Sequence, residues 1–368
     1  MNRRACLLLL AMIALLAQRN NVYAKQKHTD TLHAAALKPY GRYRLTEAGQ
    51  LELISSAVHV GVTFRGTQCV VYAAAQGAGA HNYMQYELDG VYQKRIRVNG
   101  NRDTAIVITA ATPGMHALWI YKATEAHTGP VFITKVAGRG IKPATVAKAP
   151  LIEFIGNSIT CGAAADASTV ACGAGEYHDQ HNAYMAYGPR VARLLGANYI
   201  VSSVSGIGIY RTWNREGPSM PQVYEHIDFQ QGSTQQWDFK KYSPVIVSIA
   251  LGTNDLSNGD GKTERKPFEE QVFIDHYVSF VKLVKLKYPR AQIALLSSPM
   301  VKGTSREVLE KCLTSIKAQV DQAYPKDKPV QLFFFPPMEA RGCTGHPSVE
   351  DHGVLAGQLQ PFFRQLLP

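Results

Sequence analysis

The sequence predicts an α/β protein of two parts: a β-sandwich first, and then a parallel sheet covered on both faces by helices. Two observations favour this fold class. Short β-rich runs separated by Gly, Asn, Asp and Pro turns fill residues 42–148, and no helix-length amphipathic run interrupts them. After Pro150 apolar strands alternate with longer amphipathic segments, which is typical of a three-layer α/β/α domain.

The N-terminal part is predicted to contain seven strands, at residues 60–64, 69–73, 83–88, 94–98, 104–109, 116–123 and 131–136. Turn sequences such as Asp89-Gly90 separate these runs. Residues 138–150 combine small residues with two prolines and indicate a link between domains. We therefore expect a β domain over residues 41–145 and an α/β domain over residues 150–368.

The C-terminal part is predicted to contain strands at residues 151–155, 199–204, 244–251, 292–297 and 331–335. Helices are expected at 183–195, 268–288 and 305–323. In an open parallel sheet the active site lies at the carboxyl ends of the strands. The loops that follow the predicted strands are therefore where functional side chains should gather.

The N-terminus has the pattern of a secretory signal. Two arginines precede an apolar run at residues 5–17, and small residues end at Ala24, so we expect residues 1–24 to be removed and the protein to be periplasmic or secreted. A short membrane anchor is the alternative, but the run is short for a bilayer span and no later segment is long enough. The net charge is +11, yet its lysines and arginines are scattered, which argues against a nucleic-acid site.

Five cysteines follow the predicted signal: Cys69, Cys161, Cys172, Cys312 and Cys343. Their spacings match no zinc template. In an oxidising compartment Cys161 with Cys172, and Cys312 with Cys343, are the pairings we expect, although sequence does not fix connectivity. Cys69 lies in an apolar strand and is expected to be a buried free thiol.

Four loops after the predicted strands each offer a different chemical group. A strand runs directly into a Gly-Asn-Ser turn that ends at Ser158, a candidate nucleophile. Gly206 follows the second strand, where its backbone N–H can reach an oxyanion, and Asn254 follows the third with a side-chain amide. The imidazole of His346, which precedes a proline, is a candidate general base.

Each of these residues also has a purely structural interpretation. Ser158 alone would more often be a helix cap, and Asn254 could cap a turn. Gly206 or its neighbour Gly208 could serve only a tight turn, and His346 could be a surface histidine. The occurrence of all four blocks in this order favours catalysis over the structural interpretations.

These four blocks, in this order, resemble those of SGNH hydrolases, the GDSL lipase and esterase superfamily. Three segments, VGVTFRGT at residues 60–67, IGNSITCG around Ser158 at 155–162 and AYG at 186–188, are similar to carbohydrate esterase family 2 acetylesterases. The resemblance covers roughly residues 41–368. It implies a jelly-roll domain followed by an SGNH domain that removes O-acetyl groups from plant polysaccharides.

The resemblance also implies a role for each matched residue. Ser158 would be the nucleophile, His346 the base, and the oxyanion hole would consist of the N–H groups of Ser158 and Gly206 with the Asn254 side chain. An acetyl-enzyme would form, without metal or cofactor.

The chain departs from the superfamily pattern in two places. Asn157 replaces an aspartate of the first block, and Thr344 and Cys343 stand where an aspartate usually precedes the histidine. His346 is therefore expected to be oriented by a backbone carbonyl, giving a Ser-His dyad, or by a distant acid.

The predicted partner is an acetylated glycan. Tyr210 and Trp213, just after the glycine block, could form a platform for a sugar ring, although core packing explains them equally well. The stretch at residues 176–181 is interpreted as a polar loop near the site entrance rather than a metal site. Alternative functions are a sialate, other glycan or lipid esterase, or a carbohydrate-binding protein with a degenerate hydrolase domain.

Overall fold

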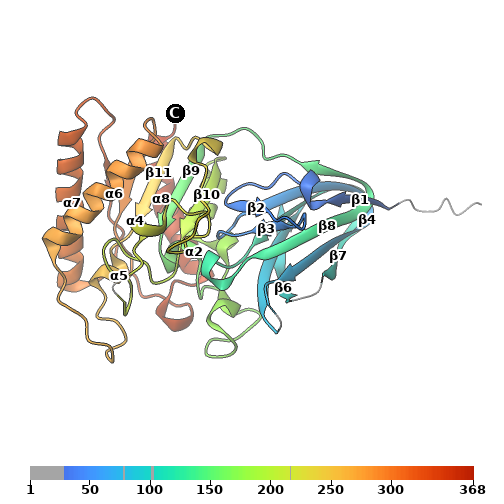
Figure 1. Ribbon diagram of the computed structural model, residues 1–368, viewed down its shortest axis with the longest axis horizontal. Coiled ribbons are helices and arrows are strands. Elements are labelled where there is room, and N and C mark those ends of the chain that lie inside the picture. Colours follow the sequence, from blue (N-terminus) through green and yellow to red (C-terminus); the bar gives the residue numbers. More distant parts are fainter. Residues whose placement is uncertain (1–28, 78, 101–102, 216) are drawn as a thin grey trace, which may run out of the picture.

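The structure, a computed structural model, describes residues 29–77, 79–100, 103–215 and 217–368. The signal segment predicted over residues 1–24 lies outside the described residues. Two parts lie side by side, an N-terminal β domain and a C-terminal domain in which helices flank a sheet (Figure 1). Among the described residues, no helix combines the length and apolar character that a membrane crossing needs.

The β domain is antiparallel. Its strands are β1 (Asp30–His33), β2 (Tyr43–Leu45), β3 (Leu51–Leu53), β4 (His59–Ala75), β5 (His81–Leu88), β6 (Val91–Asn99), β7 (Thr104–Lys122) and β8 (Val131–Ala144). They pair in the order β2-β3-β8-β4-β7-β5-β6, with β1 also on β8. Strands near both ends of this order share one apolar core, which includes Leu51 of β3 and Val98 of β6. The sheet therefore curls around its own core, which agrees with the predicted fold class.

Several predicted strands in this domain are parts of longer ones. The runs at 60–64 and 69–73 form the single strand β4, because a register shift between Gly66 and Gln68 bends the strand without ending it. The runs at 104–109 and 116–123 likewise merge into β7. The predicted link at 138–150 was wrong in its first half, since β8 continues to Ala144 and pairs with β4 there.

The C-terminal domain contains a parallel sheet of five strands, ordered β10-β9-β11-β12-β13. These strands are β9 (Leu151–Gly156), β10 (Asn198–Ser203), β11 (Ile246–Ala250), β12 (Gln292–Leu296) and β13 (Gln331–Phe333). The main helices are α3 (Tyr187–Leu194), α6 (Glu270–Lys287), α7 (Gly303–Ala323) and α8 (Val349–Leu366). Short helices α2 (Ser158–Cys161), α4 (Met220–Val223) and α5 (Thr253–Leu256) lie in the loops.

Alternate residues of the strands face two different helical layers. Ile155 of β9 belongs to the same core as Phe273 of α6, whereas its neighbour Phe154 packs in the core that contains Leu359 of α8. This two-sided burial explains why the strands read as continuous apolar runs. The helix predicted at 183–195 is divided, since Ala186 is extended between the 3-10 turn η4 (Ala183–Met185) and α3.

Candidate active site

Ser158 is presented where β9 ends and helix α2 begins. Asn157 caps this helix, and its side-chain oxygen accepts a hydrogen bond from the N–H of Ile159 at 3.1 Å. Asn157 thus fills the N-cap position with a hydrogen-bonding side chain that carries no charge. Because Ser158 is the first residue of the helix, its N–H has no carbonyl partner within the helix.

The hydroxyl of Ser158 lies 2.9 Å from Nε2 of His346, although the two residues are 188 positions apart. Nδ1 of His346 lies 3.2 Å from the backbone carbonyl of Thr344. A carbonyl only accepts, so this contact places the imidazole proton on Nδ1 and leaves Nε2 as the acceptor for the serine hydroxyl. The backbone of Thr344 is left-handed, with φ of 50°, and this conformation turns its carbonyl back toward the ring.

The predicted dyad geometry is therefore present, and among the described residues no carboxylate contacts Nδ1 of His346. Burial lowers the pKa of His346 below its ordinary value, which keeps the ring neutral and able to accept a proton. The Tyr177 hydroxyl lies 3.3 Å from the same Nε2. Tyr177 belongs to the stretch at residues 176–181 that we expected near the site entrance, but the sequence did not predict its contact with His346, which only the fold creates.

Gly206 and Asn254 lie in two loops that are held together by hydrogen bonds. Gly206 has a φ of 78°, which suits glycine, and follows β10. The side-chain amide of Asn254 donates to the carbonyl of Ile207 at 2.9 Å, which fixes its orientation and leaves its second N–H for another acceptor. The carboxylate of Asp255 accepts the N–H groups of Ile209 and Tyr210, so it braces this loop.

The two aromatic residues predicted as a sugar platform differ in their surroundings. Tyr210 packs against Phe268, and its hydroxyl accepts the N–H of Glu269 at 3.2 Å. Trp213 has a side chain that is 44% exposed, and its backbone N–H donates to the carbonyl of Gly206 at 2.8 Å. Trp213 is therefore the aromatic side chain of this loop that is open to solvent beside the glycine block.

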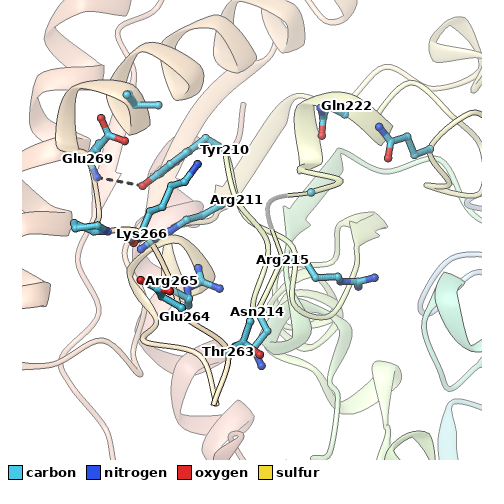
Figure 2. Close-up of a pocket in the computed structure, with 14 residues that line it drawn as sticks. Tyr210, Arg211, Asn214, Arg215, Gln222, Thr263, Glu264, Arg265, Lys266 and Glu269 are labelled. Atoms are coloured by element: carbon cyan, nitrogen blue, oxygen red, sulfur yellow. Dashed lines mark hydrogen bonds between the residues drawn. The ribbon is translucent and has the colours of Figure 1, made fainter. Parts of the chain in front are cut away.

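A cavity of about 1000 Å³ lies beside these loops. Figure 2 shows its two walls, one from the segment that contains Tyr210 and Arg215 and the other from residues 263–269. The guanidinium of Arg265 donates to the carbonyl of Asn254 at 3.0 Å, which connects the cavity wall to the candidate oxyanion loop. The lining is mostly polar and charged, and it does not include Ser158 or His346.

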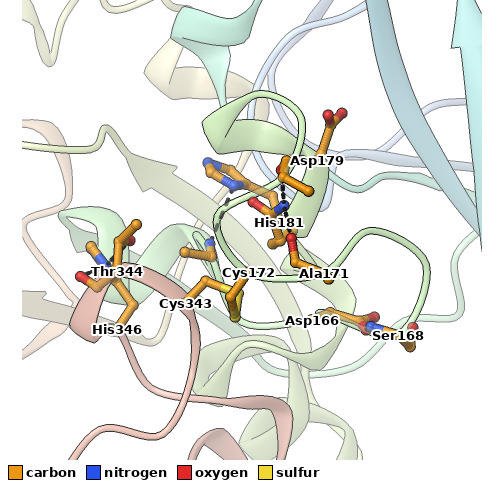
Figure 3. Close-up of a disulfide and its surroundings, with 12 residues drawn as sticks. Asp166, Ser168, Ala171, Cys172, Asp179, His181, Cys343, Thr344 and His346 are labelled. Atoms are coloured by element: carbon orange, nitrogen blue, oxygen red, sulfur yellow. Dashed lines mark hydrogen bonds between the residues drawn. A yellow bond between two sulfur atoms is a disulfide. The ribbon is translucent and has the colours of Figure 1, made fainter.

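The disulfide differs from both predicted pairings. Cys172 is bonded to Cys343, which immediately precedes Thr344 (Figure 3). Cys161 is the last residue of α2, and its buried thiol lies 3.0 Å from the Ser203 hydroxyl. Cys312 lies on the buried face of α7 and belongs to the apolar core. The predicted pairs Cys161–Cys172 and Cys312–Cys343 were thus wrong because one cysteine of each lies inside a core, whereas the prediction of a buried free Cys69 is confirmed.

A residue of the β domain reaches beneath the candidate site. Glu125 is buried, and its carboxylate accepts the N–H of Ser205 and lies 3.4 Å from Nε2 of His181. Burial alone would raise the pKa of Glu125, but His181 and Ser205 lower it to about 2, so the side chain is a buried anion. Sequence analysis missed Glu125, because no local motif marks it.

Two family models match the chain in succession. The model "Carbohydrate esterase 2 N-terminal" matches residues 40–145, and the GDSL-like lipase/acylhydrolase family matches residues 154–328. Cellulase/esterase CelE of Acetivibrio thermocellus is 29% identical over 87% of this chain, and the chain spans only 38% of that relative's length. An acetylxylan esterase/glucomannan deacetylase of Cellvibrio japonicus is 29% identical over 70% of the chain and 71% of its own length.

A solved structure shows the same arrangement of domains. It is a family two carbohydrate esterase from Clostridium thermocellum in complex with cellohexaose, and it is 26% identical to this chain. It superimposes with a TM-score of 0.77 over 91% of this chain and 98% of its own. With both domains matched in order, the chain has the domain architecture of the family 2 carbohydrate esterases, within the SGNH/GDSL hydrolase superfamily.

Proposed function

We propose that this protein is an exported carbohydrate O-acetylesterase that hydrolyses acetyl esters on polysaccharides or oligosaccharides. The observation that carries the proposal is the contact of 2.9 Å between the Ser158 hydroxyl and Nε2 of His346, with the imidazole proton held on Nδ1 by the Thr344 carbonyl. A serine paired in this way with a neutral imidazole is an activated nucleophile. Export rests on the sequence of residues 1–24.

In the proposed reaction His346 takes the hydroxyl proton of Ser158 as the oxygen attacks the acetyl carbonyl carbon. The N–H groups of Ser158 and Gly206 and the free N–H of the Asn254 amide would receive the negative charge that develops on the carbonyl oxygen. His346 then protonates the departing sugar oxygen. Water, deprotonated by the same imidazole, releases acetate from the acetyl-enzyme.

The carbonyl of Thr344 takes the place of the usual aspartate in orienting the ring. It fixes the tautomer as an aspartate would, but it does not add a negative charge next to the imidazolium. Glu125 supplies a charge from further away, and its field raises the pKa of His346 against the effect of burial. In this dyad the Thr344 carbonyl would orient the imidazole, and the buried Glu125 carboxylate would stabilise its positive charge.

The surroundings of the loops that carry Gly206 and Asn254 favour a glycan over a lipid. The neighbouring cavity is lined mainly by polar and charged side chains, which suit sugar hydroxyl groups (Figure 2). Trp213 offers an exposed ring beside Gly206 that can stack on a pyranose. The relatives named for acetylxylan and glucomannan make these two polysaccharides the first substrates to test.

The proposal is tested by acetate release from acetylated xylan and glucomannan, with a small chromogenic acetyl ester in parallel. We expect the wild type to release acetate and both Ser158→Ala and His346→Ala to lose at least about 1000-fold in kcat, as removal of a triad member does. Ser257→Ala, which changes a serine outside the proposed dyad, is the matched control.

Equal rates in the wild type and Ser158→Ala would refute a serine esterase. Cleavage of the small ester without release from either polysaccharide would keep the chemistry and direct the search to other acetylated glycans, sialic acids included. Binding of glycan without turnover of any ester would favour the degenerate carbohydrate-binding alternative.

A further inference from the structure

Three potential metal ligands meet where the two domains touch. His81 comes from β5 of the β domain, and Glu176 and His178 come from the 3-10 turn η3 (Tyr177–Gln180) and the residue before it. One nitrogen or carboxylate oxygen from each residue lies within 4.8 Å of the others. His81 is buried, His178 is half-buried and Glu176 is exposed, so the cluster is open to solvent on one side.

Both histidines have one ring nitrogen already engaged by an acceptor. Nε2 of His81 contacts the carboxylate of Asp179, and Nε2 of His178 lies 3.2 Å from the backbone carbonyl of His81. Neither acceptor carries a proton, so both contacts place the ring proton on Nε2 and leave Nδ1 with a lone pair. A carboxylate or carbonyl on one ring nitrogen is the usual way in which a metal-binding histidine is oriented.

The remaining contact within the cluster brings two acceptors together. Nδ1 of His178 lies 3.5 Å from a carboxylate oxygen of Glu176. With the proton of His178 on Nε2, a nitrogen lone pair and a carboxylate oxygen approach each other, and this approach becomes favourable when a cation lies between them.

We propose that His81, Glu176 and His178 bind a divalent transition-metal ion such as Zn²⁺, with Asp179 as the carboxylate that orients His81. Two imidazoles and a carboxylate suit Zn²⁺ and its neighbours better than Mg²⁺ or Ca²⁺. Ligand atoms about 2 Å from Zn²⁺ in tetrahedral geometry are about 3.4 Å apart, so the cluster has to contract. The exposed side chain of Glu176 can make that movement by rotation.

The metal would be structural, and its effect would reach the esterase site through Tyr177. This residue lies between Glu176 and His178 in sequence, and its hydroxyl is 3.3 Å from Nε2 of His346. Fixing η3 to β5 would therefore hold Tyr177 against His346 and tie the two domains together. The inference does not depend on the proposed esterase activity, because the three ligands are distinct from Ser158 and His346.

The test is direct binding of Zn²⁺ and Co²⁺ to the purified chain after treatment with a chelator and dialysis. We expect one equivalent of Zn²⁺ by titration calorimetry, a Co²⁺ absorption spectrum of a four-coordinate nitrogen and oxygen site, and a rise in melting temperature with Zn²⁺. Glu176→Gln and His178→Gln should each weaken Zn²⁺ binding at least about 10-fold, and Asp179→Asn by about 10- to 100-fold.

The control is His226→Gln, which changes a histidine whose ring bonds to the carbonyl of Gln230. It should bind Zn²⁺ as the wild type does. Glu176 is exposed, so Glu176→Gln keeps the fold even where a histidine variant does not. Failure to bind one equivalent of Zn²⁺, or equal affinity in the wild type and Glu176→Gln, would overturn the proposal.

Discussion

The imidazole of His346 takes its orientation from the carbonyl of Thr344, 3.2 Å from Nδ1. The sequence blocks predicted that Ser158 and His346 would be partners, because each block follows a strand whose carboxyl end lies at one edge of the sheet. The source of the orientation stayed open between a carbonyl and a distant acid. It depends on the left-handed backbone of Thr344, a conformation that threonine does not favour and that a sequence pattern does not predict.

The pKa of His346 predicts the acid side of the pH profile. Burial lowers this pKa below the ordinary value of 6.5, so the imidazole stays neutral and basic at pH values where an exposed histidine is protonated. We expect kcat/KM for a small acetyl ester to fall on the acid side with an apparent pKa below 6.5. An acid limb centred above pH 7 would contradict this account of the base.

At the scale of elements, the alternation of strands and helices after Pro150 was predictable because both faces of the parallel sheet are buried, which makes each strand an apolar run. The β domain was harder to divide, since β4 and β7 continue through bends that read as turns. The disulfide could not be predicted at all from spacing. It joins Cys172 to Cys343 across 171 positions, and only the folded chain places these cysteines together.

This disulfide ties the loop that ends at η3 to the turn that carries His346 (Figure 3). Replacing both Cys172 and Cys343 with serine should lower the free energy of unfolding by about 2–4 kcal/mol, because the unfolded chain loses a cross-link. It should also lower kcat more than it changes KM, since the turn at Thr344 becomes freer.

Urea unfolding and ester kinetics, with and without reductant, measure both effects of the serine replacements. Reductant should lower the stability and the kcat of the wild type, and it should change neither quantity in the double variant. A double variant as stable and as active as the wild type would show that the bond does not hold the turn.

At the scale of the whole molecule, buried charges join the two domains. Arg42 of the β domain donates to carbonyls of Tyr224 and His226, and Arg95 donates to carbonyls of Asp179 and His181. Such contacts link residues more than 80 positions apart, so no local pattern predicts them. Through these contacts the β domain helps to hold the segments of the α/β domain that surround the candidate site.

Glu125 allows this connection between the domains to be measured. Glu125→Gln keeps the size of the side chain but removes the buried charge that Ser205 and His181 contact. A charged hydrogen bond is worth about 1.5–3 kcal/mol, so we expect kcat/KM to fall by about 10- to 100-fold while the protein stays folded. Because the charge of Glu125 raises the pKa of His346, the acid limb of the profile should also move to lower pH.

Glu52→Gln is the matched control for Glu125→Gln. It removes another buried carboxylate of the β domain, one that pairs with Arg44 within that domain. This control can lose stability, but it should keep the acid limb where the wild type has it. If Glu125→Gln also kept the wild-type kcat/KM and acid limb, the β domain would only buttress the fold. If the acid limb shifts in Glu125→Gln and not in Glu52→Gln, an anion of the β domain raises the pKa of the general base in the α/β domain. The two domains would then form one catalytic unit.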